Sequence, residues 1–136
     1  MAELDLALLC TSATFREGLL SVLEAGLERF SPDNYPANLA PVLVFRLSFS
    51  EDDFGTAHVV RITVRHDDGE PVAEVGVGVT YEPPAESDPA LSHFTVVIHQ
   101  LLMQIRRDGL YLVEITLDGE LSSRIPFRVR ARLPQA

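Results

Sequence analysis

The chain has few features that would cross-link it, carry it through a membrane or export it. Its 136 residues include a single cysteine, Cys10, so no intrachain disulfide can form. No apolar run approaches the roughly 20 residues that a membrane-spanning helix needs. The first residues, Met-Ala-Glu-Leu-Asp, carry acids where a secretory signal carries bases. We therefore expect the protein to work in a reducing compartment, the cytoplasm.

Basic residues are also scarce. Twenty Asp and Glu stand against eleven Lys and Arg, which gives a net charge of −9 at pH 7. Binding to nucleic acid needs basic side chains that neutralise phosphates, and docking on an anionic membrane has the same requirement. An excess of acids mainly keeps a protein soluble. The composition therefore predicts no nucleic-acid partner and no membrane partner.

The length and the apolar content fit one folded domain. A chain of this length buries roughly two-thirds of the surface of its unfolded form, and 46% of the residues are hydrophobic. Nine Pro and eight Gly cluster between apolar runs, as in proteins built from many short strands. We therefore expect residues 1–136 to form a single domain made mainly of β-structure.

Alternation of apolar and polar residues marks several strands. His58 to Arg65 is a clear case, because every second side chain is an apolar residue that can face a core. The same pattern predicts strands at residues 3–10, 42–49, 72–81, 91–100, 111–117 and 125–133. The residues predicted to face inward include Val60, Ile62, Val64, Val75, Val77, Val79, Phe94, Val96 and Ile98.

Two Asp-Gly pairs, Asp108-Gly109 and Asp118-Gly119, bracket one of these strands. Asp-Gly favours a tight turn, because Gly accepts positive φ and the Asp carboxylate bonds to nearby backbone. Tyr111 stands two residues after the first turn glycine, where immunoglobulin-like sandwiches carry a tyrosine corner. We predict that Tyr111 is largely buried and that its hydroxyl bonds to backbone between Leu102 and Asp108.

Residues 14–30 allow two interpretations. Thr14 to Glu17 fits a helix capping box, and the apolar residues that follow are spaced as on one face of a helix. Gly18 and Gly26 instead divide the segment into short pieces, which favours strands joined by turns. Local propensity alone favours the helix.

Seven or eight strands joined by Gly, Pro and Asp turns are typical of an antiparallel β-sandwich. The sequence therefore predicts an all-β, immunoglobulin-like sandwich. One short helix near residues 14–30 is the alternative that the capping-box pattern leaves open.

The order of these features resembles that of an uncharacterised, mainly actinobacterial family of small β-sandwich proteins of unknown function. The shared features are an apolar first strand, Glu-Gly-Leu-Leu-x-Val-Leu-x-x-Gly at 17–26, Asp-Asp-Gly at 67–69, and Asp-Gly-x-Tyr, Asp-Gly and Phe-x-Val within 108–129. The resemblance implies an immunoglobulin-like sandwich in which residues 19–30 are extended, and we follow it in predicting strand here over the helix. Glu24 stands where the family often has Gly. The resemblance supplies no catalytic residue.

Acidic turns are the best local candidates for binding a ligand. Loops that meet at one end of a sandwich can supply the six to eight oxygens that Ca²⁺ needs. No Asp-x-Asp-x-Asp-Gly spacing is present, so a calcium or small-molecule site is an alternative and not the first hypothesis. The carboxylates concerned are Asp52, Asp53, Asp67, Asp68, Glu86 and Asp88.

Other residue types give little support for chemistry. Among the histidines His58, His66, His93 and His99, the last two share a strand but stand roughly 20 Å apart, too far for one zinc ion. No Gly-x-Ser-x-Gly elbow occurs, and Cys10 fits a small buried hydrophobe. Gly76 and Gly78 lack the third glycine and the helix of a phosphate loop. We predict no catalytic residue, no cofactor and no metal ligand, and therefore not an enzyme.

Arg128, Arg130 and Arg132 share one face of the last predicted strand. They can face an acidic partner, or Glu114 can pair with one arginine across the sheet. The first functional hypothesis is a non-enzymatic sandwich that binds another protein, or a second copy of itself, through an exposed strand edge. The alternatives are the acidic-loop binder of calcium or a small molecule, and an acidic mimic of nucleic acid that blocks a basic partner.

Overall fold

The computed structural model describes residues 1–88 and 90–133. Over this part of the chain the regular structure is strand, apart from one turn of 3₁₀ helix, η1 (Glu51–Asp53). The all-β prediction is confirmed, and no helix in the described residues is long and apolar enough to cross a membrane. The strands are β1 (Glu3–Cys10), β2 (Ser12–Arg16), β3 (Leu19–Leu23), β4 (Arg29–Phe30), β5 (Ala37–Leu39), β6 (Val42–Ser48), β7 (Ala57–His66), β8 (Pro71–Thr80), β9 (Phe94–Gln100), β10 (Met103–Ile105), β11 (Gly109–Leu117) and β12 (Glu120–Val129).

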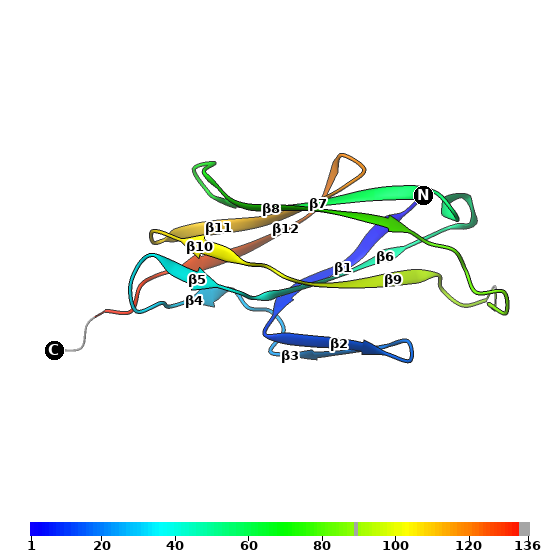
Figure 1. The fold of residues 1–136 in the computed structure, drawn as a ribbon, viewed down its shortest axis with the longest axis horizontal. Coiled ribbons are helices and arrows are strands. Elements are labelled where there is room, and N and C mark those ends of the chain that lie inside the picture. The colour runs from blue at the N-terminus through cyan, green and yellow to red at the C-terminus, as the bar shows by residue number, and fades with distance from the viewer. Residues whose placement is uncertain (89, 134–136) are drawn as a thin grey trace.

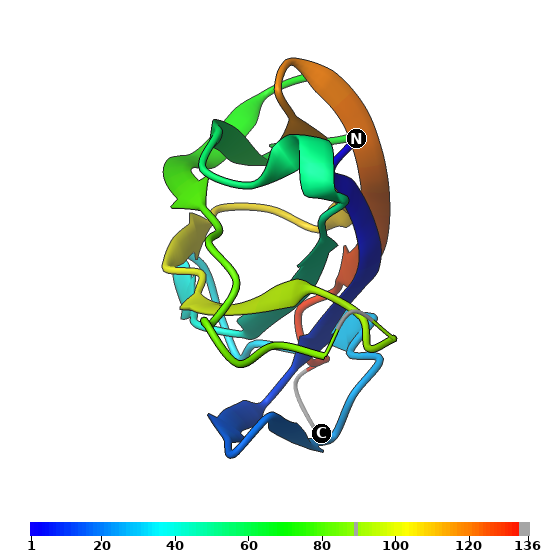
Figure 2. The same cartoon turned by 90° about the vertical axis from the view of Figure 1, so that its right-hand side faces the viewer.

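The strands form two layers with the main core between them (Figure 1, Figure 2). One layer is a five-stranded sheet in the order β4-β12-β11-β7-β8. The other is the sheet β1-β6-β9, which the short pair β10-β5 continues past Pro41, whose carbonyl accepts a hydrogen bond from the Leu101 amide. Proline has no amide hydrogen, so the ladder is interrupted at this point. The pairings are antiparallel except that of β4 with β12, which is parallel.

The core is built from alternate residues of each strand, because successive side chains point to opposite faces. Val60, Ile62 and Val64 of β7 are buried, as predicted. The valines of β8 pack against the same core but are only partly buried, since β8 lies at the edge of its sheet. Other buried members are Leu9, Leu43, Phe45, Leu47, Ile105, Val113, Ile115, Phe127 and Val129.

Residues 12–23 form a hairpin and not a helix. β2 and β3 are joined by the two-residue loop Glu17-Gly18, whose φ angles are 52° and 76°. Positive φ at both loop residues is typical of the type I′ turn, which matches the twist of paired strands. The helical interpretation of 14–30 is therefore wrong. The extended conformation that the family resemblance implied holds for β3 and β4.

The hairpin covers the outer face of the β1-β6-β9 sheet and forms a small third layer (Figure 2). Its Leu20 and Val22 pack on a second buried cluster made of Cys10, Val42 and Val44. Because β6 is covered on both faces, consecutive residues of this strand are buried. Burial in this cluster also raises the pKa of the Cys10 thiol, which favours the uncharged form.

The orientation of β9 differs from the prediction. Val97 packs against the main core, whereas Val96 packs against the second cluster under the hairpin. Phe94, Val96 and Ile98 therefore face outward and not inward as predicted. Apolar residues occupy both faces of this strand, so alternation alone does not distinguish the two orientations. The strand count is also higher than the seven or eight predicted, because β2–β5 and β10 are short pieces of two to five residues.

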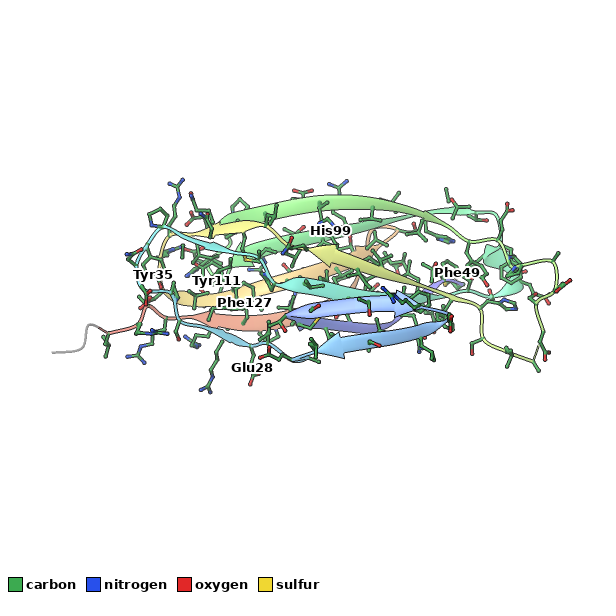
Figure 3. All side chains as sticks on the ribbon, turned by 60° about the horizontal axis from the view of Figure 1, so that its bottom comes forward. Glu28, Tyr35, Phe49, His99, Tyr111 and Phe127 are labelled. Carbon is green, nitrogen blue, oxygen red and sulfur yellow. The ribbon has the colours of Figure 1, made fainter. Side chains whose placement is uncertain are left out.

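Tyr111 forms the predicted corner. Its side chain is 2% exposed, and its hydroxyl donates a 2.7 Å hydrogen bond to the Arg107 carbonyl, four residues upstream. The ring stacks on Phe127 at a centroid distance of 5.4 Å, which joins β11 to β12 (Figure 3). β12 starts directly after the Asp118-Gly119 turn at Glu120, earlier than the predicted start at residue 125.

Candidate functional site

The acidic loops do not converge on a metal site. Among residues 1–88 and 90–133, no three His, Cys, Asp or Glu side chains are grouped so that they could hold a metal ion. Asp53 accepts hydrogen bonds from the Ser50 amide and hydroxyl, and the amide bond is the main cause that lowers the pKa of Asp53 to about 2. Asp68 pairs with Arg107, which lowers its pKa to about 2. Asp53 and Asp68 therefore hold their own loops in place.

The four histidines are held at separate places by different partners. The His66 imidazole lies against Gly109, where a Cβ atom would clash with the ring. His93 contacts the Tyr81 hydroxyl through Nδ1 at 3.2 Å, and His99 lines an opening between the sheets next to Leu102. These arrangements belong to the scaffold and do not bring the histidines together.

His58 and Asp118 form a His–Asp contact that resembles part of a catalytic dyad; His66 also lies beside two aspartates, with Nδ1 at 3.0 Å from Asp67 and 3.2 Å from Asp68. Nδ1 of His58 donates to Oδ2 of Asp118 at 2.7 Å, and this bond is the main cause that lowers the pKa of Asp118. The other ring nitrogen, Nε2, is buried without a hydrogen-bond partner in the described structure, and the ring packs beside Phe49. A general base must reach the proton it removes. The buried Nε2 cannot do so, and the pair instead ties the β11–β12 turn to β7.

β8 is a long free edge of the five-stranded sheet. It has ten residues, and within residues 1–88 and 90–133 its only hydrogen-bonded neighbour strand is β7. The amide and the carbonyl of Val59 on β7 both bond to Asp118, on the side of β7 away from β8. Along an antiparallel strand, the amide and carbonyl of successive residues point alternately to the two neighbouring strands. The amides and carbonyls of the even-numbered residues of β7 therefore point toward β8, where these residues are paired with Val75, Val77 and Val79.

It follows that the amides and carbonyls of the remaining β8 residues point away from the sheet. These residues are Glu74, Gly76, Gly78 and Thr80. Both glycines have open space where a Cβ atom would lie, so no side chain screens the backbone there. Natural edges are usually protected by charges, prolines or bulges. Here Pro71, the bulge near it and Glu74 protect only the first part of the strand.

The outward face of the same sheet carries five of the eleven basic residues of this acidic chain. The chain contains no lysine, so all eleven basic residues are arginines. We call this surface the arginine face; its arginines are Arg29 on β4, Arg61 and Arg65 on β7, and Arg124 and Arg128 on β12. Glu74 pairs with Arg61, and Glu114 pairs with Arg65 and Arg124.

The expected cross-strand partner of Glu114 is therefore an arginine, but not one of Arg128, Arg130 and Arg132. Glu114 is paired in register with Arg124 on β12, and Oε2 of Glu114 lies 2.9 Å from Nη2 of Arg124. Arg65 and Arg124 both lower the pKa of Glu114, and the larger cause is the hydrogen bond from Arg65. Arg132 pairs with Asp33 at 3.6 Å.

A concave pocket of about 560 Å³ lies at the β4 end of the arginine face. Arg29, Arg128 and Arg130 line it together with the apolar residues Leu110 and Pro126. Glu28 contributes the one carboxylate of the lining and stands at the margin of the molecule in Figure 3. We call this hollow the arginine pocket.

Sequence reasoning identified part of the arginine pocket and missed the rest. The alternation of β12 placed Arg128 and Arg130 on one face. Arg29 joins them only because residues 29–30 pair in parallel with residues 128–129, a contact across about a hundred residues that no local pattern signals. The two glycines of β8 did not mark its free edge in the sequence, because an edge strand cannot be distinguished from a central strand by its own sequence.

The model of a family of unknown function, DUF6941, matches residues 5–130. This range includes the whole of the five-stranded sheet and both clusters of buried residues. No curated protein matches the chain.

Proposed function

Since the chain belongs to the DUF6941 family, to which no function is assigned, we propose its role from the geometry: a non-enzymatic β-sandwich module that self-associates through the free edge of β8. The observation that supports this proposal is the edge sequence Glu74-Val-Gly-Val-Gly-Val-Thr80. Its central five residues read the same in both directions around Val77. A second copy that approaches in antiparallel orientation therefore meets a matching strand.

The pairing register follows from which backbone groups are free. Around a twofold axis at Val77, Gly76 faces Gly78 of the second copy, and Glu74 faces Thr80 of the second copy. Each of these pairs joins residues with outward-pointing backbone, so each can exchange two hydrogen bonds. The two five-stranded sheets would then continue as one sheet across the axis.

Side chains are compatible with this register. Val75, Val77 and Val79 are partly buried, and in the pair they lie opposite valines of the second copy on the core side of the sheet. Cross-strand pairs of β-branched residues stabilise a sheet by a few tenths of a kcal/mol each. Glu74 lies opposite a threonine and not opposite another glutamate, so the register avoids a pair of like charges.

Other parts of the proposal concern chemistry and location. The non-enzymatic assignment is supported by the buried Nε2 of His58, since this is the residue best placed to act as a base. A mimic of nucleic acid would present carboxylates on its surface, whereas the outward face of this sheet presents arginines. We therefore favour pairing with a protein strand over mimicry of nucleic acid. The single buried Cys10 is compatible with a reducing location, and we place the module in the cytoplasm.

The experiment compares two double variants of the β8 edge. Gly76→Lys/Gly78→Lys places lysines opposite one another across the twofold axis, where like charges repel. Gly76→Thr/Gly78→Thr fills the same open positions with uncharged residues that favour strands. Sedimentation velocity over a hundredfold range of protein concentration should give a dimer for the natural chain and the threonine variant, and a monomer for the lysine variant.

A monomer at every concentration for the natural chain would contradict self-association. In that case, pairing of the β8 edge with a strand from another protein would be the next hypothesis. A dimer that both double variants retain would show that the chain self-associates through another surface. Unfolding of each variant by urea controls for damage to the fold.

A further inference from the structure

Arg29 and Arg128 lie directly opposite each other on adjacent strands. They are Cα partners in the parallel pair β4–β12, and adjacent strands are about 4.8 Å apart. The next residues, Phe30 and Val129, pack in the core, so both arginines point to the outer face. Like charges directly opposite each other destabilise a sheet. An anion bound between the two guanidinium groups would relieve this repulsion.

Arg29, Arg128 and Arg130 differ from most arginines of the described residues, which pair with carboxylates. In the described residues, Arg29, Arg128 and Arg130 make no ion pair, although the chain has nearly two acids for each base. The charge of Arg130 helps to lower the pKa of Asp108, although the larger causes are two hydrogen bonds. Oδ1 of Asp108 accepts these bonds from the Tyr35 hydroxyl and from the Ala131 amide. Of the other eight arginines, Arg16 and Arg106 also make no ion pair in the described residues, and six pair with carboxylates: Arg46, Arg61, Arg65, Arg107, Arg124 and Arg132.

The backbone around the arginine pocket is held in place. The amides of Arg128, Arg130 and Arg132 donate to carbonyls of residues 28, 30 and 32 at 2.8 to 3.0 Å. Phe30 packs edge-on against Phe127, at a centroid distance of 5.5 Å. The positions from which the arginines extend are therefore fixed before any ligand arrives, which lowers the entropy cost of binding.

We infer that the arginine pocket binds a small organic phosphate: a phosphate group held by Arg29, Arg128 and Arg130, with an apolar body resting on Leu110 and Pro126. Guanidinium groups form paired hydrogen bonds with phosphate oxygens, and three of them suit a dianion. A volume of about 560 Å³ is within the range of small-molecule sites. The net charge of −9 disfavours a long polyanion, so a small ligand is expected.

The test uses phenyl phosphate, inorganic phosphate, benzoate and phenol as probes in isothermal titration calorimetry at low ionic strength. Phenyl phosphate should bind at least tenfold more tightly than inorganic phosphate, because only the former also contacts the apolar residues. Benzoate, with one negative charge, should bind about tenfold more weakly than phenyl phosphate. Phenol should show no binding.

Variants locate the site. Arg128→Gln should weaken binding of phenyl phosphate tenfold or more, since a charged hydrogen-bond pair is lost. Arg128→Lys keeps the charge but loses the planar donor pair, so its affinity should lie between those of Arg128→Gln and the natural chain. The matched control is Arg16→Gln, which removes the same charge from the β2–β3 hairpin and should change affinity less than twofold.

Three results would overturn the inference. One is the absence of any heat or thermal stabilisation with phenyl phosphate. Another is an equal loss of affinity in Arg128→Gln and Arg16→Gln, which would indicate attraction to overall charge and not to the pocket. The third is equal affinity for phenyl phosphate and inorganic phosphate. Binding should persist in Gly76→Lys/Gly78→Lys, so the pocket and the β8 edge are tested independently.

Discussion

Tyr111 joins three parts of the fold through one side chain. Its hydroxyl bonds to the Arg107 carbonyl, its ring stacks on Phe127, and the edge of the His66 ring meets it at a centroid distance of 5.0 Å. The burial of Tyr111 raises the pKa of its hydroxyl, which therefore stays protonated and able to donate. Figure 3 places it near Tyr35 and far from Phe49, at the opposite end of the sandwich. The residue serves the scaffold at one end of the molecule.

Tyr111→Phe should lower the free energy of unfolding by about 1 kcal/mol, because the Arg107 carbonyl loses its donor while the packing of the ring is kept. Urea denaturation followed by far-UV circular dichroism measures this change. Self-association and binding of phenyl phosphate should both be unchanged. A stability equal to that of the natural chain would mean that water replaces the hydroxyl without cost.

Glu24 occupies a backbone conformation that suits glycine, with φ of 52°. Glu24→Gly should raise the free energy of unfolding by about 0.5 kcal/mol, because the left-handed conformation is unfavourable for a residue with a Cβ atom. Glu86→Gly is the control: Glu86 is not among the described residues with positive φ, and the change should be neutral or destabilising. Thermal unfolding of the two variants side by side gives the comparison.

Single residues were predictable where a local rule determines them. The Tyr111 corner followed from the distance between a turn glycine and an aromatic residue. Glu24 stands where the family that the chain resembles often has glycine. Its positive φ explains why glycine suits this position. The partner of Glu114 was predicted by residue type, but choosing Arg124 required the start of β12, which the sequence pattern placed too late.

Strands were predicted well where one face is apolar and the other polar. β7 meets this condition, so its buried face was correct. β6 and β9 do not meet it, because the β2–β3 hairpin covers the far side of their sheet and makes apolar residues useful on both faces. The hairpin itself was obscured by helix-like spacing in residues 14–30. Its two-residue turn at Glu17-Gly18 decided the conformation.

Glu114 links β7, β11 and β12 through Arg65 and Arg124. The folded state lowers the pKa of Glu114, so the stabilisation it provides is present above the unfolded value of about 4.3 and is lost as the pH falls through the folded value. Glu114→Gln should therefore lower stability by about 1 kcal/mol at pH 7. The difference from the natural chain should shrink as the pH falls below about 4.

Urea denaturation at pH 7, 5, 4 and 3 measures this dependence, with Glu86→Gln as a control that removes one carboxylate from the β8–β9 loop. The control should follow the natural chain at every pH. A difference between Glu114→Gln and the natural chain that stays constant from pH 7 to pH 3 would mean that packing, and not ionisation, accounts for the effect.

The whole molecule combines an acidic net charge with one basic face. The fold class could be predicted because turns and strand spacing are local signals. Neither proposed surface could be predicted in full, because each depends on the order of strands in a sheet. The edge position of β8 and the contact of β4 with β12 are both set by pairings between distant segments. Asp53 and Asp68, two of the acidic-turn carboxylates that the sequence indicated, hold their own loops in place.

Salt should affect the two proposed activities in opposite directions. Two copies that pair along β8 each carry a net charge of −9 and repel each other, so screening should tighten the dimer. The screening length falls from about 10 Å at 0.1 M to about 3 Å at 1 M ionic strength. Phenyl phosphate is attracted to three arginines, so the same screening should weaken its binding.

Sedimentation velocity and calorimetry at 0.05, 0.15 and 0.5 M NaCl measure both trends on the natural chain. The dimer dissociation constant should fall several-fold across this range while the phenyl phosphate dissociation constant rises several-fold. Gly76→Thr/Gly78→Thr should repeat the first trend because its net charge is unchanged. A dimer that dissociates as salt rises would contradict pairing along β8, since attraction between the acidic turns of one copy and the arginine face of the other would then hold it together.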